Sequence, residues 1–261
     1  MPELPEVESM RAAWDRCVAG AVLAAPDTVD PRLLDPAVAA SLCGRAGPAA
    51  RRGKVLLLPI GDQVLRLHPR MTGRLLTEGA PGRACRLGWD LGSRRVRFDD
   101  PRRLGTAEVL PARADPTAGL DLGPEPWPTP LSGPDFAARF AGARGPIKPL
   151  LLEGARVAGI GNIGASEALF DAGIHPATPA GTLGPTAWTA LGRGVWRWVS
   201  RTLAAHGGGD LTLLHAGGDN PFQVYGRAGA PCPRCGAPIL TAALGGRNTW
   251  FCGTCQPPAP A

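Results

Sequence analysis

The first residues of the chain carry groups that could do covalent chemistry. Pro2 becomes the terminal residue once Met1 is removed, and proline then offers a secondary amine. A free amine of this kind has a pKa of about 7.7–8, so modest tuning leaves it unprotonated and nucleophilic. Glu3 follows as a candidate general acid/base, and Glu6 lies in the first turn of an expected helix. Taken alone, Pro2 is better explained as a processing feature with no chemical role.

Four cysteines near the C-terminus have the spacing of a metal site. Cys232 and Cys235 form one CxxC pair, Cys252 and Cys255 form another, and residues 236–251 separate the pairs. Two such pairs can place four thiolates tetrahedrally around one ion, so the spacing predicts one structural zinc ion. The alternative of two redox dithiols is disfavoured, because no thioredoxin-like βαβ pattern surrounds them.

Composition and charge limit the function classes. The 261 residues are 44% hydrophobic and 19% charged, which is typical of a globular protein. No run of about 18 apolar residues is present to span a membrane, and the N-terminus lacks the basic region of a signal peptide, so a cytoplasmic protein is expected. The net charge of +6 favours a polyanionic partner. Among 28 basic residues only Lys54 and Lys148 are lysines; codon bias explains the ratio, but each lysine is worth inspecting.

Three further cysteines, Cys17, Cys43 and Cys85, are scattered among apolar or mixed neighbours. We expect them to be buried or inert.

The elements that must position these groups change in kind along the chain. A helix is expected over 5–18, followed by short β-type runs at 55–60, 63–68, 94–98 and 106–110. The runs are too closely spaced for βαβ crossovers and predict an antiparallel sandwich. Segment 111–134 is rich in Pro and Gly and suits a boundary. Helical patterns then cover 135–140, 148–153, 163–172 and 185–206.

These patterns predict an α+β fold with four parts. They are an N-terminal β-sandwich with flanking helices (1–115), a Pro/Gly-rich linker (116–134), a helical domain (135–224) and a zinc finger with its tail (225–261).

The ordered motifs resemble those of the formamidopyrimidine-DNA glycosylase and endonuclease VIII family. The resemblance spans essentially the whole chain. Leu4 favours the formamidopyrimidine branch, because a glycine at this position would indicate the endonuclease VIII branch. The matching motifs are MPELPEVE at the N-terminus, RRGK at 51–54, HPRMTGR at 68–74, DPRRLG at 100–105, AGIGNIGASEALF at 158–170, GIHP at 173–176, VYGR at 224–227 and the zinc ribbon.

The resemblance implies a base-excision enzyme with a helix–two-turn–helix domain that binds damaged double-stranded DNA between its two halves. We expect a monomer in the cytoplasm, associated with the nucleoid when bound to DNA. Pro2 would displace an oxidised base, with a purine favoured, through a Schiff base, and β,δ-elimination would then cut the strand. Glu3 would move protons, Glu6 would support it, and Lys54 would contact the phosphate beside the lesion.

Base extrusion leaves a gap in the duplex that side chains must fill. By resemblance, Met71 and Leu104 would enter the gap and Arg103 would face the orphaned base. Leu104 stands where the formamidopyrimidine branch usually has phenylalanine. The alternative for Met71 is core filling, which its polar Gly/Arg-rich surroundings disfavour.

Three more residues are implied to hold the DNA backbone. Asn162 matches a phosphate-binding asparagine, although a helix cap is an alternative. Arg247, in the hairpin between the cysteine pairs, would grip the same backbone. We expect it to act with the catalytic residues Pro2, Glu3 and Lys54. His68 would lie near the phosphates, with a packed strand-end histidine as its alternative.

Several positions depart from the family pattern. Gly164 stands in place of a tyrosine, Gly154 in place of a common glutamine, and Pro69-Arg70 in place of Leu-Gly. Segment 207–222 lacks the Arg-Asp pair of the family's base-capping loop. Two alternatives follow: a catalytically weak or inactive paralogue that binds damaged DNA, and a zinc-ribbon protein that contacts RNA or protein, against which the N-terminal motif argues.

Overall fold

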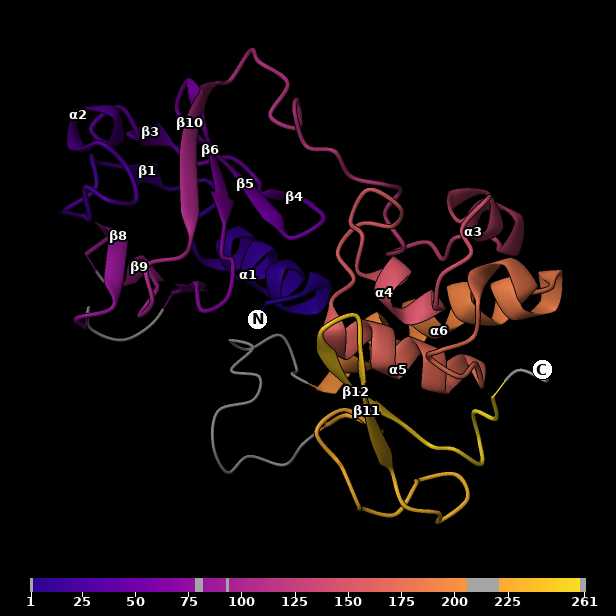
Figure 1. The fold of residues 1–261 in the computed structure, drawn as a ribbon. Helices are drawn as coiled ribbons and strands as arrows, with labels where there is room; N and C mark the ends of the chain where they lie inside the picture. Colours follow the sequence, from indigo (N-terminus) through magenta and orange to yellow (C-terminus); the bar gives the residue numbers. More distant parts are fainter. Residues whose placement is uncertain (1, 78–81, 93, 206–220, 259–261) are drawn as a thin grey trace. The chain divides into compact units, whose positions relative to one another are not determined.

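The computed structural model describes residues 2–77, 82–92, 94–205 and 221–258. The chain divides between Leu120 and Asp121 into two compact units (Figure 1). This point lies inside the Pro/Gly-rich segment, where proline removes backbone donors that a continuous sheet or helix would need. Within the described ranges, no helix is long and apolar enough to cross a membrane.

The described strands of the first unit form two antiparallel four-stranded sheets, with strand orders β10-β6-β5-β4 and β2-β8-β9-β7, and a two-stranded sheet of β1 and β3. Alternate side chains of β5 enter the core that the sheets share, because successive side chains of a strand point to opposite faces. The predicted antiparallel sandwich is confirmed. The strands are β1 (Val22–Leu23), β2 (Thr28–Val29), β3 (Gly44–Arg45), β4 (Ala50–Arg52), β5 (Val55–Ile60), β6 (Gln63–His68), β7 (Arg74–Leu76), β8 (Cys85–Asp90), β9 (Arg95–Asp99) and β10 (Thr106–Pro111).

Two helices, α1 (Leu4–Cys17) and α2 (Pro36–Ala39), belong to the same unit. Trp14 of α1 is fully buried, its Nε1 donates to the Gly47 carbonyl at 3.0 Å, and its ring meets Trp89 edge-on at 6.4 Å. These contacts fix α1 against the sandwich, so they also fix Pro2 and Glu3, which directly precede the helix.

The predicted strands 55–60 and 63–68 are confirmed at both ends, and the expected first helix is shifted by one residue. Strands β1–β4, β7 and β8 and helix α2 were not predicted. Most are too short to show a period, and β8 carries a charged residue in its interior. Arg86 is buried there because Asp30 pairs with it at 3.4 Å, and that partner is invisible in the local sequence.

The second unit contains the predicted helices, each within a few residues of its expected bounds, and α3 begins at Gly133 inside the predicted linker. Helix α6 packs on α5 and α3 through its buried apolar stripe. The elements are α3 (Gly133–Arg139), α4 (Ile147–Leu151), α5 (Asn162–Ala172), η1 (Ala180–Thr182), α6 (Pro185–Ala205), β11 (Leu240–Leu244) and β12 (Arg247–Phe251).

Strands β11 and β12 form the hairpin expected between the cysteine pairs. Gly245 and Gly246 make its turn with φ values of 57° and 72°, which residues with a side chain rarely adopt. Most of the divergent segment 207–222 lies outside the described residues, which resume at Pro221.

Candidate active site and nucleic-acid interface

The N-terminus is held by a reciprocal capping box. The Glu3 side chain accepts from the backbone N–H of Glu6, and a Glu6 carboxylate oxygen accepts from the backbone N–H of Glu3 at 3.0 Å. Both side chains are buried, while Pro2 is half-buried directly before them. The two glutamates are thereby fixed beside the expected nucleophile.

Burial controls the protonation of Glu6. Removal from water, followed by the negative charge of Glu3, raises the pKa of Glu6 to about 7. A carboxyl group that titrates near neutrality can hold or release a proton beside Glu3 at working pH.

Lys54 lies in the turn between β4 and β5. Neighbouring Arg51 donates from its Nη1 to the Gly53 carbonyl at 2.9 Å and pairs through Nε with Glu8 of α1 at 3.1 Å. Both members of this ion pair are almost fully buried, so it anchors the turn that carries Lys54 to the helix that begins after Glu3.

His68 ends β6 in the same neighbourhood. Burial, then the charges of Arg70 and Lys54, lower the pKa of His68 to about 4. The imidazole is therefore neutral at neutral pH, and its Nδ1 accepts from the backbone N–H of Arg70 at 2.9 Å. The structure thus places Lys54 and His68 near each other, at the end of the β5–β6 pair opposite its turn.

Two loops, 69–73 and 100–105, rest on the same side chains. Asp100 is buried and accepts from the Thr72 hydroxyl and, at 2.7 Å, from the backbone N–H of Gly105. A Cβ on Gly73 or Gly105 would approach the Phe98 ring to 2.5 or 2.7 Å, so both loops need glycine there. These contacts hold the two loops together.

The loops present apolar side chains to solvent. Met71 is 42% exposed and Leu104 is 39% exposed. Core filling is therefore the wrong explanation for Met71. Exposed apolar groups on two loops that share a support suit insertion into a base stack.

Arg103 is held by a carboxylate that sequence reasoning missed. Its backbone is left-handed (φ 53°), and its Nε donates to Asp30 Oδ2 at 2.9 Å. Burial would raise the pKa of Asp30, but the hydrogen bond from the Arg32 amide and the Arg103 guanidinium lower it. No motif marked Asp30, because it lies 73 positions before its partner.

In the second unit, Asn162 begins α5 but does not cap it, because Gly161 is the N-cap residue. The Asn162 Oδ1 accepts from Lys148 Nζ at 2.6 Å, and its Nδ2 donates to the Asn248 carbonyl at 3.1 Å. The helix-cap alternative for Asn162 is therefore wrong. The contact to Asn248 also places Asn162 next to the hairpin that begins β12 with the exposed Arg247.

Lys148 is the second lysine of the chain and has no solvent exposure. Besides Asn162, its ammonium group donates to the Thr249 hydroxyl at 2.7 Å and to the Asn248 carbonyl at 3.2 Å. It therefore ties α4 to α5 and to β12. The rarity of lysine was the only signal in the sequence.

Glu167 of α5 is fully buried and anchors the chain where it resumes after the undescribed segment. Its carboxylate accepts from the backbone N–H groups of Gln223, Val224 and Tyr225 at 2.9–3.0 Å. Arg201 adds an ion pair at 3.3 Å.

The four C-terminal cysteines converge. Their sulfur atoms all lie within 4.8 Å of one another, with 3.8 Å from Cys232 to Cys255 and 3.5 Å from Cys235 to Cys252. Tetrahedral zinc–thiolate bonds of about 2.3 Å would place the sulfurs about 3.8 Å apart, so the residues fit a structural metal ion.

The scattered cysteines, expected to be buried or inert, differ in exposure, and their inertness stays a prediction. Cys85 is buried and Cys17 is half-buried, but Cys43 is exposed. Cys43 lies in the short connection between α2 and β3, which runs over the surface.

The departure at Gly164 has a structural explanation. A Cβ at this position would meet the Trp198 ring at 2.5 Å. The indole of Trp198, which is 1% exposed, fills the space beside α5 that a side chain at 164 would need.

Profiles of three domains match the chain in order. The formamidopyrimidine-DNA glycosylase N-terminal domain matches residues 1–107, the formamidopyrimidine-DNA glycosylase H2TH domain matches 122–212, and the zinc finger found in FPG and IleRS matches 229–258.

Individual proteins give the same answer. The formamidopyrimidine-DNA glycosylase of Gloeobacter violaceus is 39% identical over 98% of both chains. The crystal structure of MutM (Fpg) from Thermus thermophilus has a TM-score of 0.82 and 34% identity over 99% of this chain and all of that one. MutM bound to DNA with carbocyclic 8-oxo-G has a TM-score of 0.86 and 30% identity over 98% of this chain and all of that one. Matching domains and identity along almost its whole length show that the chain belongs to the formamidopyrimidine-DNA glycosylase family.

Proposed function

We propose that the chain is a bifunctional DNA glycosylase and abasic-site lyase that removes oxidised purines from duplex DNA. The names of its relatives and the 8-oxo-G DNA bound by one of them support this reaction class. The observation that carries the proposal is the capping box, which holds buried Glu3 and Glu6 directly after Pro2.

In this reaction the Pro2 amine, freed by removal of Met1, attacks the sugar carbon that carries the base. The carbon–base bond breaks, and the base leaves with the bonding electrons and gains a proton. The sugar opens to an iminium on Pro2, which acidifies the neighbouring sugar C–H. Loss of that proton expels the 3′ phosphate, and a second elimination expels the 5′ phosphate. Glu3 moves the protons, and Glu6 supports it as a group that titrates near neutrality.

Exposed groups of the two linked loops serve base extrusion. Met71 and Leu104 fill the gap in the stack, and Arg103 contacts the orphaned base. Leucine covers less stacking area than phenylalanine, so Leu104 fills the gap less completely.

The DNA backbone is held by Lys54 and His68 in one unit and by Asn162 and Arg247 in the other. The cysteine ligands hold one zinc ion, which supplies no reaction chemistry and stabilises the hairpin that presents Arg247. We further propose that the protein acts as a monomer in the cytoplasm and on the nucleoid.

Borohydride trapping tests the nucleophile. Tag-free protein incubated with an abasic-site duplex and borohydride is expected to become covalently attached to the DNA, because hydride reduces the iminium. An uncleaved N-terminal tag should abolish trapping but leave DNA binding intact. The same tag at the C-terminus is the matched control.

Full trapping by protein with a blocked Pro2 amine would refute the proposal that Pro2 is the nucleophile. Binding without any trapping or strand cleavage would instead favour a non-catalytic paralogue that binds damaged DNA, an alternative motivated by Leu104 and by the divergent segment 207–222.

A further inference from the structure

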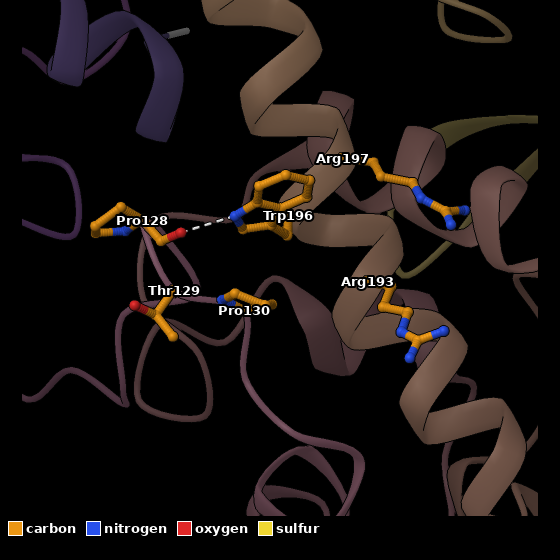
Figure 2. Close-up of a pocket in the computed structure, with 6 residues that line it drawn as sticks. All are labelled: Pro128, Thr129, Pro130, Arg193, Trp196 and Arg197. Atoms are coloured by element: carbon orange, nitrogen blue, oxygen red, sulfur yellow. Dashed lines mark hydrogen bonds between the residues drawn. The ribbon is translucent and has the colours of Figure 1, made fainter.

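A hollow of about 420 Å³ lies on the outer face of α6, wholly within the second unit. One wall is the Pro-rich stretch Pro128, Thr129 and Pro130, and the other consists of Arg193, Trp196 and Arg197 of the helix (Figure 2). None of these residues takes part in the base-excision chemistry proposed above.

Trp196 and the prolines give the two walls of the hollow a fixed apolar surface. Trp196 is 36% exposed, an unusual state for the largest apolar side chain. Its Nε1 donates to the Pro128 carbonyl at 2.7 Å, so donor and acceptor satisfy each other (Figure 2). The locked indole and the proline rings therefore offer carbon surface with little polar character of their own.

Two arginines at the rim of the hollow carry positive charge that no described acidic residue neutralises. Helix α6 has three arginines and no acidic residue. Arg201 pairs with Glu167 and Asp171 at 3.3 and 3.1 Å, whereas Arg193 and Arg197 are exposed and have no acidic partner in the part of the chain that the structure describes. Like charges four residues apart on a helix repel each other, and a bound anion would relieve that repulsion.

We propose that this hollow binds an acidic peptide segment of a partner protein. An apolar side chain of the segment packs on Trp196 and the prolines, and adjacent carboxylates pair with Arg193 and Arg197. The two guanidinium groups extend to the same side of the helix, away from the proline wall (Figure 2). That arrangement fits a ligand with an apolar group at one end and neighbouring carboxylates at the other.

Single-stranded nucleic acid fits less well. Sequence-tolerant binding of single strands uses aromatic faces along an open groove that follows the backbone. Here one aromatic ring faces a proline wall, so successive bases would find no second ring to stack on among the lining residues.

The test uses full-length protein and a fluorescein-labelled peptide, SLFDDS, followed by anisotropy. We expect saturable binding of SLFDDS. Binding should be lost when both aspartates are replaced by asparagine (SLFNNS) or when the leucine and phenylalanine are replaced by glycine and serine (SGSDDS). R193Q/R197Q and Trp196→Ala should each weaken binding by about ten-fold or more. The first removes the charges that pair with the peptide carboxylates, and the second removes the ring on which its apolar side chain packs. The matched double variant R113Q/R144Q removes two exposed arginines elsewhere and should change binding by less than about two-fold.

Two further readouts locate the site. The indole N–H signal of Trp196, assigned through Trp196→Phe, should shift on peptide addition, and borohydride trapping on abasic DNA should be unchanged in R193Q/R197Q. Equal peptide affinity in R193Q/R197Q and R113Q/R144Q would overturn the proposal, as would no saturable binding up to about 1 mM. Selective loss of oligothymidylate binding in R193Q/R197Q, without peptide binding, would replace the peptide by nucleic acid. The proposal does not depend on the excision reaction, so either can fail alone.

Discussion

The Glu6 carboxyl group makes stability depend on pH. Burial and the Glu3 charge raise its pKa from 4.5 to about 7, so the folded protein resists the ionisation that the unfolded chain undergoes near pH 4.5. Its contribution to stability is therefore fully present below about pH 4.5 and is lost as pH rises through 7.

Glu6→Gln should remove this loss, because a glutamine oxygen can still accept from the Glu3 amide but carries no charge. We expect the stability of Glu6→Gln relative to wild type to rise between pH 5 and 8 by about 3 kcal/mol at most, from linkage. Urea unfolding of both proteins across this range measures the difference. A constant difference would show that Glu6 does not titrate there.

Asp30 is expected to position Arg103. Asp30→Asn would weaken the ion pair that holds the guanidinium, and the ratio of kcat/KM between preferred and disfavoured opposite bases should fall by about ten-fold, the value of one directed base contact. Asp30→Glu should restore part of the preference.

The control is Asp27→Asn, which removes a nearby carboxylate that pairs instead with Arg95. A uniform loss of activity, with the opposite-base preference retained, would contradict a positioning role for Asp30.

At the scale of elements, α5 and α6 pack against each other through the indole ring of Trp198. Trp198 occupies the space next to Gly164, so Gly164→Ala should cost about 1–3 kcal/mol through overpacking. In a Trp198→Leu background the same change should cost less, because the smaller side chain leaves room. A double-mutant cycle by urea unfolding measures the coupling.

Gly145→Ala serves as the control, since a Cβ there meets nothing within 4 Å. An identical cost of Gly164→Ala in both backgrounds would rule out the ring as the cause.

At the scale of the whole molecule, the zinc ribbon has little apolar core apart from its contact with α5. Chelation, or Cys252→Ser, is expected to remove one zinc ion per chain and to lower DNA affinity, because the hairpin would no longer present Arg247. Metal analysis and a binding titration measure both effects.

Cys43→Ser is the matched control, because exposed Cys43 lies outside the cluster. Unchanged DNA affinity after complete metal loss would show that the ribbon does not grip DNA.

Much was readable from local sequence. The paired cysteines predicted their own convergence because two short knuckles joined by a hairpin need no distant partner. Strands β5 and β6 were found at both ends because a two-residue turn joins two apolar runs and sets their register. The roles proposed for Pro2 and Glu3 rest on residue type and on a short motif, both of which local sequence carries.

Only the tertiary structure decided features that depend on distant partners. Asn162 proved to be held by Lys148 and Asn248, Arg103 by Asp30, and the space at Gly164 by Trp198. The raised pKa of Glu6 likewise follows from burial, and the burial of a side chain depends on the fold around it. Local sequence carries spacing and covalent position, whereas desolvation and long-range pairing arise only when the folded chain brings separate segments together.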